Sequence, residues 1–167
     1  AIYFPKDCHF SPSLFMAALQ WQLERLGVKF IWQGEASDFK IGSNQSIRAL
    51  EISGGREIKA DEFVLCGGSW SAELACRAGL KIPMQAGKGY SLTLPHPRQL
   101  PQICSILSEA RVAVTPMGET LRVGGTMEMV GLNEDINPVR VRGIIDSFCR
   151  YYPEFSAADF DGIQPWR

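Results

Sequence analysis

The stretch of this 167-residue sequence with the clearest chemical potential is DEFVLCGGSWS, residues 61–71. The apolar run Phe63–Cys66 leads into Gly67 and Gly68, and a short helical pattern begins near Ser71. Glycines bring backbone close to a ligand because no Cβ intervenes, and the free N–H groups of a following helix suit a phosphate or the edge of a cofactor ring. Neither the dinucleotide-binding nor the P-loop glycine signature is present. The residues alone therefore favour a structural corner, with a nucleotide-holding turn as the alternative.

Other reactive side chains form no catalytic or metal-binding pattern. Cys8 and His9 are adjacent, but neighbouring side chains usually point apart and no third group orients them, so a nucleophilic dyad is not predicted. His96 lies between two prolines, as in an exposed turn. The five cysteines form no CxxC or Cys/His cluster, so neither disulfides nor a metal site is predicted, and a reducing cytoplasm is the simplest location.

The first half of the chain predicts a helix followed by a small antiparallel meander. A helix from Pro12 to Leu26 carries apolar residues at three- and four-residue spacing, and we interpret its apolar face as packed in a core. A short strand is expected at Val28–Trp32. The meander strands are expected at Ser37–Ile41, Ile47–Ile52 and Arg56–Lys59. Phe63–Cys66 is then predicted to be a strand covered on both faces, and Ser71–Ala78 a short helix.

Past Pro83 the pattern changes to that of an antiparallel sheet with one helix. The expected strands are Tyr90–Leu94, Ile103–Leu107, Val112–Val114 and Leu121–Val123, with a hairpin turn at Pro116–Glu119. A last helix is predicted from Pro138 to Tyr151. The fold class is therefore α+β or α/β, with one domain over residues 1–83 and a second over residues 84–167.

Composition limits the classes of partner. Hydrophobic residues make up 46% of the chain and charged residues 21%, which is typical of a globular protein. The formal net charge of −1 gives no basic field for nucleic acid or anionic lipid. No apolar run has the length needed to cross a bilayer.

Four segments carry a resemblance to a known family. They are DCHFSPSLFMAALQWQLERLGVKF, KADEFVLCGGSWSAEL, IPMQAGKGYSLTLP and TLRVGGTMEMVGLN. In this order and at these intervals they resemble the FAD-dependent D-amino acid oxidase superfamily, most closely the small subunit of bacterial D-amino acid dehydrogenases. Members of that family begin with a G-x-G-x-x-G turn and continue past the counterpart of QPWR. The resemblance thus implies an internal fragment, with a partial FAD-binding domain at residues 1–83 and a partial substrate-binding domain at residues 84–167.

The resemblance also implies a set of cofactor-contacting residues. Cys66, Gly67 and Gly68 match positions that approach the FAD, and Trp70 matches an aromatic residue beside that turn. Ala36 matches a position whose main chain meets the adenine. In this context the glycine turn is favoured as a flavin contact.

On the substrate side, the resemblance implies roles for Lys88, Tyr90 and Gly125. Lys88 matches an Arg/Lys-Gly pair that enters a strand near the flavin, although a solvated lysine at a strand start is an equal alternative. Tyr90 either lines the pocket or packs in the sheet, and Gly125 either borders the active site or marks close packing. Glu128 is expected to be a solvated strand carboxylate without function.

The implied function is the oxidative deamination of D-amino acids, or related amino or imino acids, to 2-oxo acids by the full-length protein. FAD does the chemistry, and a membrane quinone or another electron-transfer acceptor takes the electrons. The fragment alone is expected to be inactive and free of FAD, and its exposed apolar surface is expected to favour a homo-oligomer. We expect a location in the cytoplasm. Peripheral attachment to the inner membrane is left open. The alternative is a scaffold of the same fold that binds no cofactor and has no catalytic activity.

Overall fold

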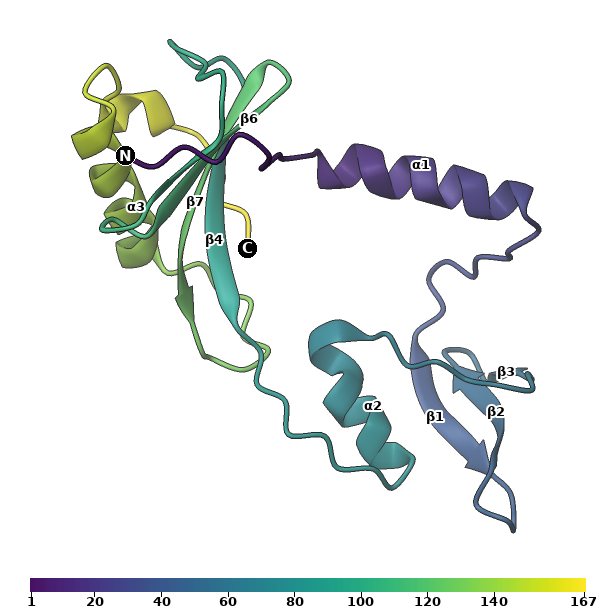
Figure 1. Cartoon of the computed structure of the whole chain (residues 1–167). Helices are drawn as coiled ribbons and strands as arrows, with labels where there is room; N and C mark the ends of the chain where they lie inside the picture. Colours follow the sequence, from purple (N-terminus) through teal and green to yellow (C-terminus); the bar gives the residue numbers. More distant parts are fainter. The chain divides into compact units, whose positions relative to one another are not determined.

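The computed structural model describes all residues, 1–167, as two compact units. One unit contains residues 1–22 and 87–167, and the other contains residues 23–86 (Figure 1). The helix α1, Pro12–Arg25, runs from the first unit into the second. The first 22 residues thus share a unit with the C-terminal half of the chain.

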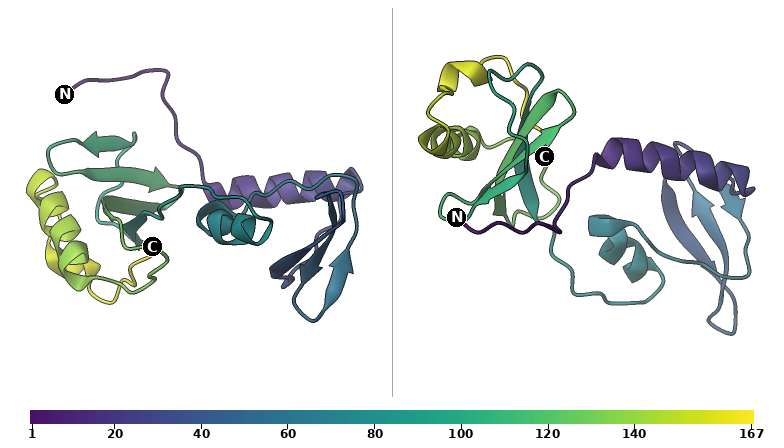
Figure 2. Two further views of the ribbon diagram at one scale, coloured as in Figure 1. Left: turned by 90° about the horizontal axis from the view of Figure 1, so that it is seen from below. Right: turned by 45° about the horizontal axis from the view of Figure 1, so that its top comes forward.

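An antiparallel sheet with a helix on one face builds the larger unit. Its strands lie in the order β4-β7-β6-β5. The elements are β4 (Lys88–Leu94), β5 (Ser105–Leu107), β6 (Val112–Met117), β7 (Thr120–Glu128), α3 (Pro138–Tyr151) and the 3-10 helix η2 (Ala157–Phe160). Figure 2 shows α3 against one face of this sheet, and the predicted sheet and final helix are confirmed.

Alternation along the strands decides which face of the sheet is buried. Leu92, Val114, Leu121 and Val123 point to one face and pack with Phe148 of α3. Phe148 is fully buried, and its ring contacts three further aromatic rings, those of Tyr152, Phe155 and Phe160. The residues between these core positions face the opposite side, which no helix of this unit covers. This open face holds the larger of the two cavities described below.

A three-stranded meander and a short helix form the smaller unit. Its elements are β1 (Ala36–Ile41), β2 (Ile47–Ile52), β3 (Arg56–Ile58), the 3-10 helix η1 (Gly68–Trp70) and α2 (Ser71–Arg77). The sheet order is β1-β2-β3 and both pairs are antiparallel, as the turn signals predicted. α2 lies beside β1, where Ala75 is buried and the Arg77 guanidinium donates to the Ser37 carbonyl.

Three predictions for the N-terminal half are wrong. Val28–Trp32 is irregular rather than a strand, and Phe63–Cys66 has no strand partner, with Val64 85% exposed. A strand needs a neighbour to satisfy its backbone N–H and C=O groups, and no segment of the chain pairs with either run. α1 forms at the predicted place but buries no residue, so its apolar face does not pack in a core of this chain.

No helix of the structure has the length and apolar character to cross a bilayer.

Candidate functional site

The predicted cofactor-contacting residues gather in the smaller unit. Ala36, Gly67 and Trp70 line one cavity of about 380 Å³, together with side chains from α2 and the segment before η1. Ala36 opens β1, where it pairs with Ile52. Cys66 adjoins the cavity-lining residues Leu65 and Gly67, but does not itself line the cavity. Two segments far apart in the sequence therefore meet at one hollow.

The turn at Gly67 and Gly68 has bare, accessible backbone. Gly68 has a positive φ of 54°, which L-residues with a Cβ adopt only with strain. A Cβ on Gly68 would meet no atom of the chain within 4 Å, and one on Gly67 would lie 3.3 Å from the Ser71 hydroxyl oxygen. The Trp70 indole beside them is 58% exposed. The backbone at Gly68 is therefore open to a flat cofactor, whereas the Ser71 hydroxyl lies close to Gly67.

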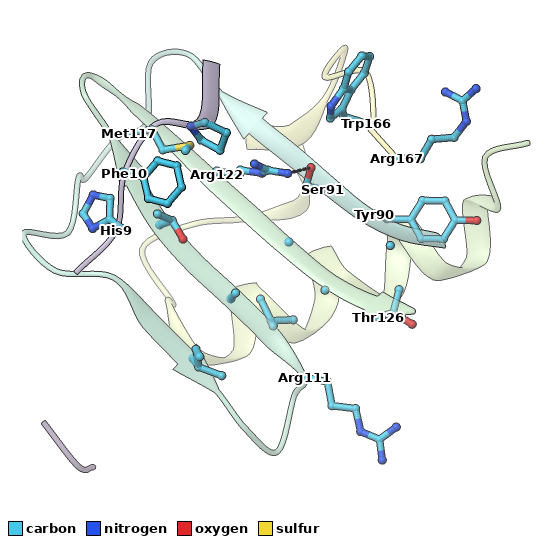
Figure 3. A pocket seen from close by; sticks show the side chains of 18 of the residues that line it. His9, Phe10, Tyr90, Ser91, Arg111, Met117, Arg122, Thr126, Trp166 and Arg167 are labelled. Atoms are coloured by element: carbon cyan, nitrogen blue, oxygen red, sulfur yellow. Dashed lines mark hydrogen bonds between the residues drawn. The ribbon is translucent and has the colours of Figure 1, made fainter. Parts of the chain in front are cut away.

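In the larger unit, a cavity of about 800 Å³ lies on the open face of the sheet (Figure 3). β4, β6 and β7 form its floor, and the segment around Phe10 and the residues Trp166 and Arg167 form its borders. Trp166 is held there by a two-way backbone bridge, in which each N–H of Ser91 and Trp166 donates to the other carbonyl at 2.8 Å. Tyr90 and Gly125, both predicted to bind substrate, adjoin this cavity and pair across β4 and β7. Tyr90 is only 3% exposed and belongs to the core cluster, so its ring packs in the sheet.

A cluster of four side chains stands at the end of this sheet; we call Lys88, Tyr90, Glu128 and Arg140 the Glu128 cluster. The Glu128 carboxylate accepts a hydrogen bond from the Tyr90 hydroxyl and lies 2.6 Å from Arg140 Nε and 3.3 Å from Lys88 Nζ. Its side chain is only 10% exposed, so the expectation of a solvated carboxylate is wrong. The hydrogen bond from Tyr90 contributes most to lowering the pKa of Glu128, and Lys88 and Arg140 lower it further.

The ammonium group of Lys88 is engaged within the chain. It donates to Asn133 Oδ1 at 3.1 Å and to the Asp135 carbonyl at 2.6 Å, besides its ion pair with Glu128. Three acceptors account for the three N–H donors of an ammonium group. Lys88 does not line the open-face cavity. Its contacts hold the loop after β7 against the start of β4.

The same cluster supports a strained residue at the cavity border. Thr126 has a φ of +52°, which is rare for a β-branched residue. Arg140 Nη1 donates to the Thr126 hydroxyl at 2.8 Å, and the Thr126 N–H donates to the Arg111 carbonyl at 3.4 Å. Arg111 also has a positive φ, of 55°. Strained backbone persists where surrounding contacts hold it, and such residues concentrate at binding sites.

Sequence reasoning missed Arg122 and gave Glu128 no role. Arg122 stands between Leu121 and Val123, whose side chains are buried on the core face. That alternation was the available signal, since it directs the arginine to the opposite face. Glu128 could be recognised only by its pairing with Lys88, which lies 40 residues earlier in the sequence.

The fold is shared with enzymes of known structure. A glycine oxidase from Geobacillus kaustophilus superposes with a TM-score of 0.72 at 20% identity, covering 90% of this chain and 39% of that one. A tryptophan 6-halogenase from Streptomyces toxytricini gives a TM-score of 0.65 at 17% identity, covering 95% of this chain and 30% of the other. At these identities the likeness shows the fold, which is confirmed as α+β.

The sequence itself establishes the family. The profile of the DAO family, described as FAD-dependent oxidoreductase, matches residues 1–166, and the chain belongs to that family. A D-amino acid dehydrogenase from Paramagnetospirillum magneticum is 32% identical over 167 residues, covering 99% of this chain and 39% of that protein. An uncharacterized oxidoreductase from Halorhodospira halophila is 32% identical over 155 residues, covering 91% of this chain and 70% of that protein. The chain thus spans about two fifths of the D-amino acid dehydrogenase.

Proposed function

We propose that the whole protein to which this chain belongs oxidises D-amino acids, or closely related amino or imino acids, to 2-oxo acids with FAD. The proposal is supported by the family and by the D-amino acid dehydrogenases among its relatives. The observation that carries it is the open-face cavity, which has basic and aromatic side chains on its border and strained backbone beside it. A small zwitterion with a carboxylate suits such a surface.

We assign the two units separate tasks, the smaller unit to the cofactor and the larger unit to the substrate. In the smaller unit Ala36, Cys66, Gly67, Gly68 and Trp70 would hold FAD, through bare backbone at the turn and the exposed indole. FAD, when bound, supplies the two-electron acceptor for oxidation at the substrate Cα. The imino acid product then hydrolyses to a 2-oxo acid and ammonia.

In the larger unit Tyr90 and Gly125 would border the bound amino acid. The Tyr90 hydroxyl is fixed by Glu128 and by the Asn137 N–H, which donates to it at 3.3 Å. A role of Lys88 as a direct substrate ligand remains a prediction. In this structure its ammonium group donates to acceptors of the chain itself. Its contacts with Glu128, Asn133 and Asp135 hold the start of β4 beside the end of β7.

The finer assignments belong to the same proposal. We propose a quinone or another electron-transfer acceptor, a homo-oligomeric assembly and a cytoplasmic location. The cytoplasm is suggested by five free cysteines, three of them exposed.

The experiment is to express the complete gene that encodes this chain and to assay dye reduction with D-amino acids, sarcosine, glycine and proline. We expect a preparation that contains FAD and reduces the dye with at least one of these substrates. A folded preparation that holds no flavin and oxidises none of them would favour the alternative, a scaffold without catalytic activity.

A further inference from the structure

The pairing of β7 with β4 is interrupted at one residue on the border of the open-face cavity. Gly89 of β4 pairs with Met127 of β7. The next residue of β4, Tyr90, pairs with Gly125. Thr126 is thus an extra residue of β7, which is the arrangement of a β-bulge, and it lines the cavity (Figure 3). Bulges re-aim side chains and are over-represented beside active sites.

The bulge decides which face of the sheet receives the side chain of Glu128. Successive side chains of a strand alternate between its faces, and one extra residue reverses the alternation beyond it. Val123 is buried on the core face, so an uninterrupted strand would direct Glu128, five positions later, to the open face. With the bulge it lies on the core side, where the Tyr90 hydroxyl and Arg140 of α3 contact it. The bulge therefore keeps this carboxylate out of the cavity lining.

Thr126 holds a backbone conformation that its own side chain disfavours. Its φ of +52° lies in the left-handed region, which β-branched residues rarely adopt. Its N–H donates to the Arg111 carbonyl at 3.4 Å, which is long for a hydrogen bond between backbone groups. Strain of this kind persists only where the surrounding contacts over-determine it. Contacts of the Thr126 side chain are therefore needed to hold the bulge.

Arg140 supplies these contacts from the first turn of α3. Its Nη1 donates to the Thr126 hydroxyl at 2.8 Å and to the Met127 carbonyl at 3.5 Å. Its Nε lies 2.6 Å from Glu128 Oε2. A guanidinium presents its donors in a fixed plane, so the ion pair with Glu128 also sets the direction from which Nη1 meets Thr126. One side chain thus ties the bulged residue to the carboxylate two positions further along the same strand.

Resting on the proposed function, we propose that Arg140 and Glu128 are positioning residues for the substrate. Glu128 orients the Arg140 guanidinium, and Arg140 holds the bulge at Thr126 in the conformation that shapes the cavity. Gly124, Gly125 and Thr126 are three successive cavity-lining residues, so a shift of the bulge moves this part of the surface. Neither Arg140 nor Glu128 lines the cavity, and both act on the substrate through Thr126.

The test uses the protein expressed from the complete gene and the amino acid that it oxidises fastest in the dye assay. Arg140→Gln removes the ion pair and weakens the contact with Thr126. We expect its KM to rise about tenfold or more, because a displaced binding surface holds the substrate poorly, whereas kcat per bound flavin changes less. Arg142→Gln, at an exposed position of the same helix, is the charge-matched control and should keep the KM of the parent. A lower yield of flavin-bound protein with unchanged KM would overturn the proposal.

Two further variants separate the contact with Thr126 from the charge of Arg140. Arg140→Lys keeps a positive charge beside Glu128, but its single nitrogen does not reproduce the two-sided contact of a guanidinium, so KM should stay raised. Thr126→Gly relieves the backbone strain. Arg140→Gln should therefore raise KM by a smaller factor in the Thr126→Gly background than in the parent. Equal factors in both backgrounds, or a parental KM in Arg140→Lys, would contradict the proposal. If Arg140→Gln does not fold, Arg140→Lys is compared in the two backgrounds instead.

Hydrogen exchange followed by mass spectrometry tests the support of the bulge without turnover. In Arg140→Gln the amides of residues 124–128 should exchange about tenfold faster than in the parent, which corresponds to the loss of one hydrogen bond to a charged group. Residues 47–58 of the other unit should exchange as in the parent. Unchanged exchange at residues 124–128 would overturn the proposal whatever the activity. Faster exchange there in a protein that oxidises no amino acid would remove the proposed function and leave the support of the bulge standing.

Discussion

At the scale of single residues, the carboxylate of Glu128 gains its stability from three partners on different segments. The Tyr90 hydroxyl, the Arg140 guanidinium and the Lys88 ammonium converge on it, and together they lower its pKa below the ordinary value of 4.5. A group whose pKa is lower in the folded state stabilises that state wherever it is ionised. Its contribution is complete above the unfolded pKa and is lost as the pH falls through the folded one.

We therefore expect Glu128→Gln to destabilise the chain at neutral pH, and we expect this effect to shrink as the pH falls below about 4.5. The measurement is the free energy of unfolding in urea for both chains across that range. Glu119→Gln, in the exposed turn between β6 and β7, is the control and should follow the parent throughout. A difference between Glu128→Gln and the parent that stays constant with pH would show that the carboxylate charge is not responsible.

The adjacent glycines of β7 offer a matched pair of substitutions. A Cβ on Gly125 would lie 2.7 Å from the Arg111 carbonyl oxygen, whereas one on Gly124 would meet nothing closer than 3.5 Å. Gly125→Ala should therefore reduce the free energy of unfolding by about 1–3 kcal/mol, the usual cost of overpacking. Gly124→Ala should change it by no more than about 0.5 kcal/mol. Equal effects in a denaturant titration would refute the close approach at Gly125.

How far residue roles can be predicted from sequence depends on the distance to their partners. The glycines at 67, 68 and 125 were selected because the segments that contain them resemble the family, whereas the residues alone favoured structural turns and close packing. Arg122 was not selected, because only the folded sheet shows that it lines a cavity without acidic side chains. Glu128 was misjudged for a similar reason, since its cations lie on β4 and α3.

At the scale of elements, α3 begins at a well-defined cap that also borders the Glu128 cluster. Asn137 Oδ1 accepts hydrogen bonds from the N–H groups of Val139 at 3.1 Å and Arg140 at 3.4 Å. Asn137→Ala should cost about 1 kcal/mol of stability, because two N–H groups of the first turn lose their acceptor. Asn137→Asp keeps an acceptor and should retain most of the stability. Thermal unfolding of the three chains measures this, and an Asn137→Asp chain as unstable as Asn137→Ala would contradict the capping role.

Local pattern predicted the elements whose partners lie close by in the sequence. α3 was predicted with its observed bounds because its apolar spacing is a local pattern. The meander and the C-terminal hairpins followed from turn residues. Phe63–Cys66 and Val28–Trp32 have strand-like composition but no partner in the chain, so they stay irregular. A strand is defined by its neighbour, which its own sequence does not specify.

At the scale of the whole molecule, the chain places its two candidate sites in separate units. The turn at residues 66–70 is exposed and α2 is only seven residues long, so the smaller unit offers few contacts for a large cofactor. We expect the purified 167-residue chain to be colourless, because no dinucleotide-binding glycine signature is present to anchor a diphosphate. Visible absorption spectroscopy checks this. A yellow chain with flavin near one equivalent would contradict it.

The most direct test of the central claim is anaerobic reduction of the flavin in the protein expressed from the complete gene that encodes this chain. We expect a D-amino acid to bleach the visible flavin absorption without any added acceptor, and we expect the 2-oxo acid to form in equal amount. A protein that binds FAD stoichiometrically but whose absorption is unchanged by every amino and imino acid tested would contradict the account.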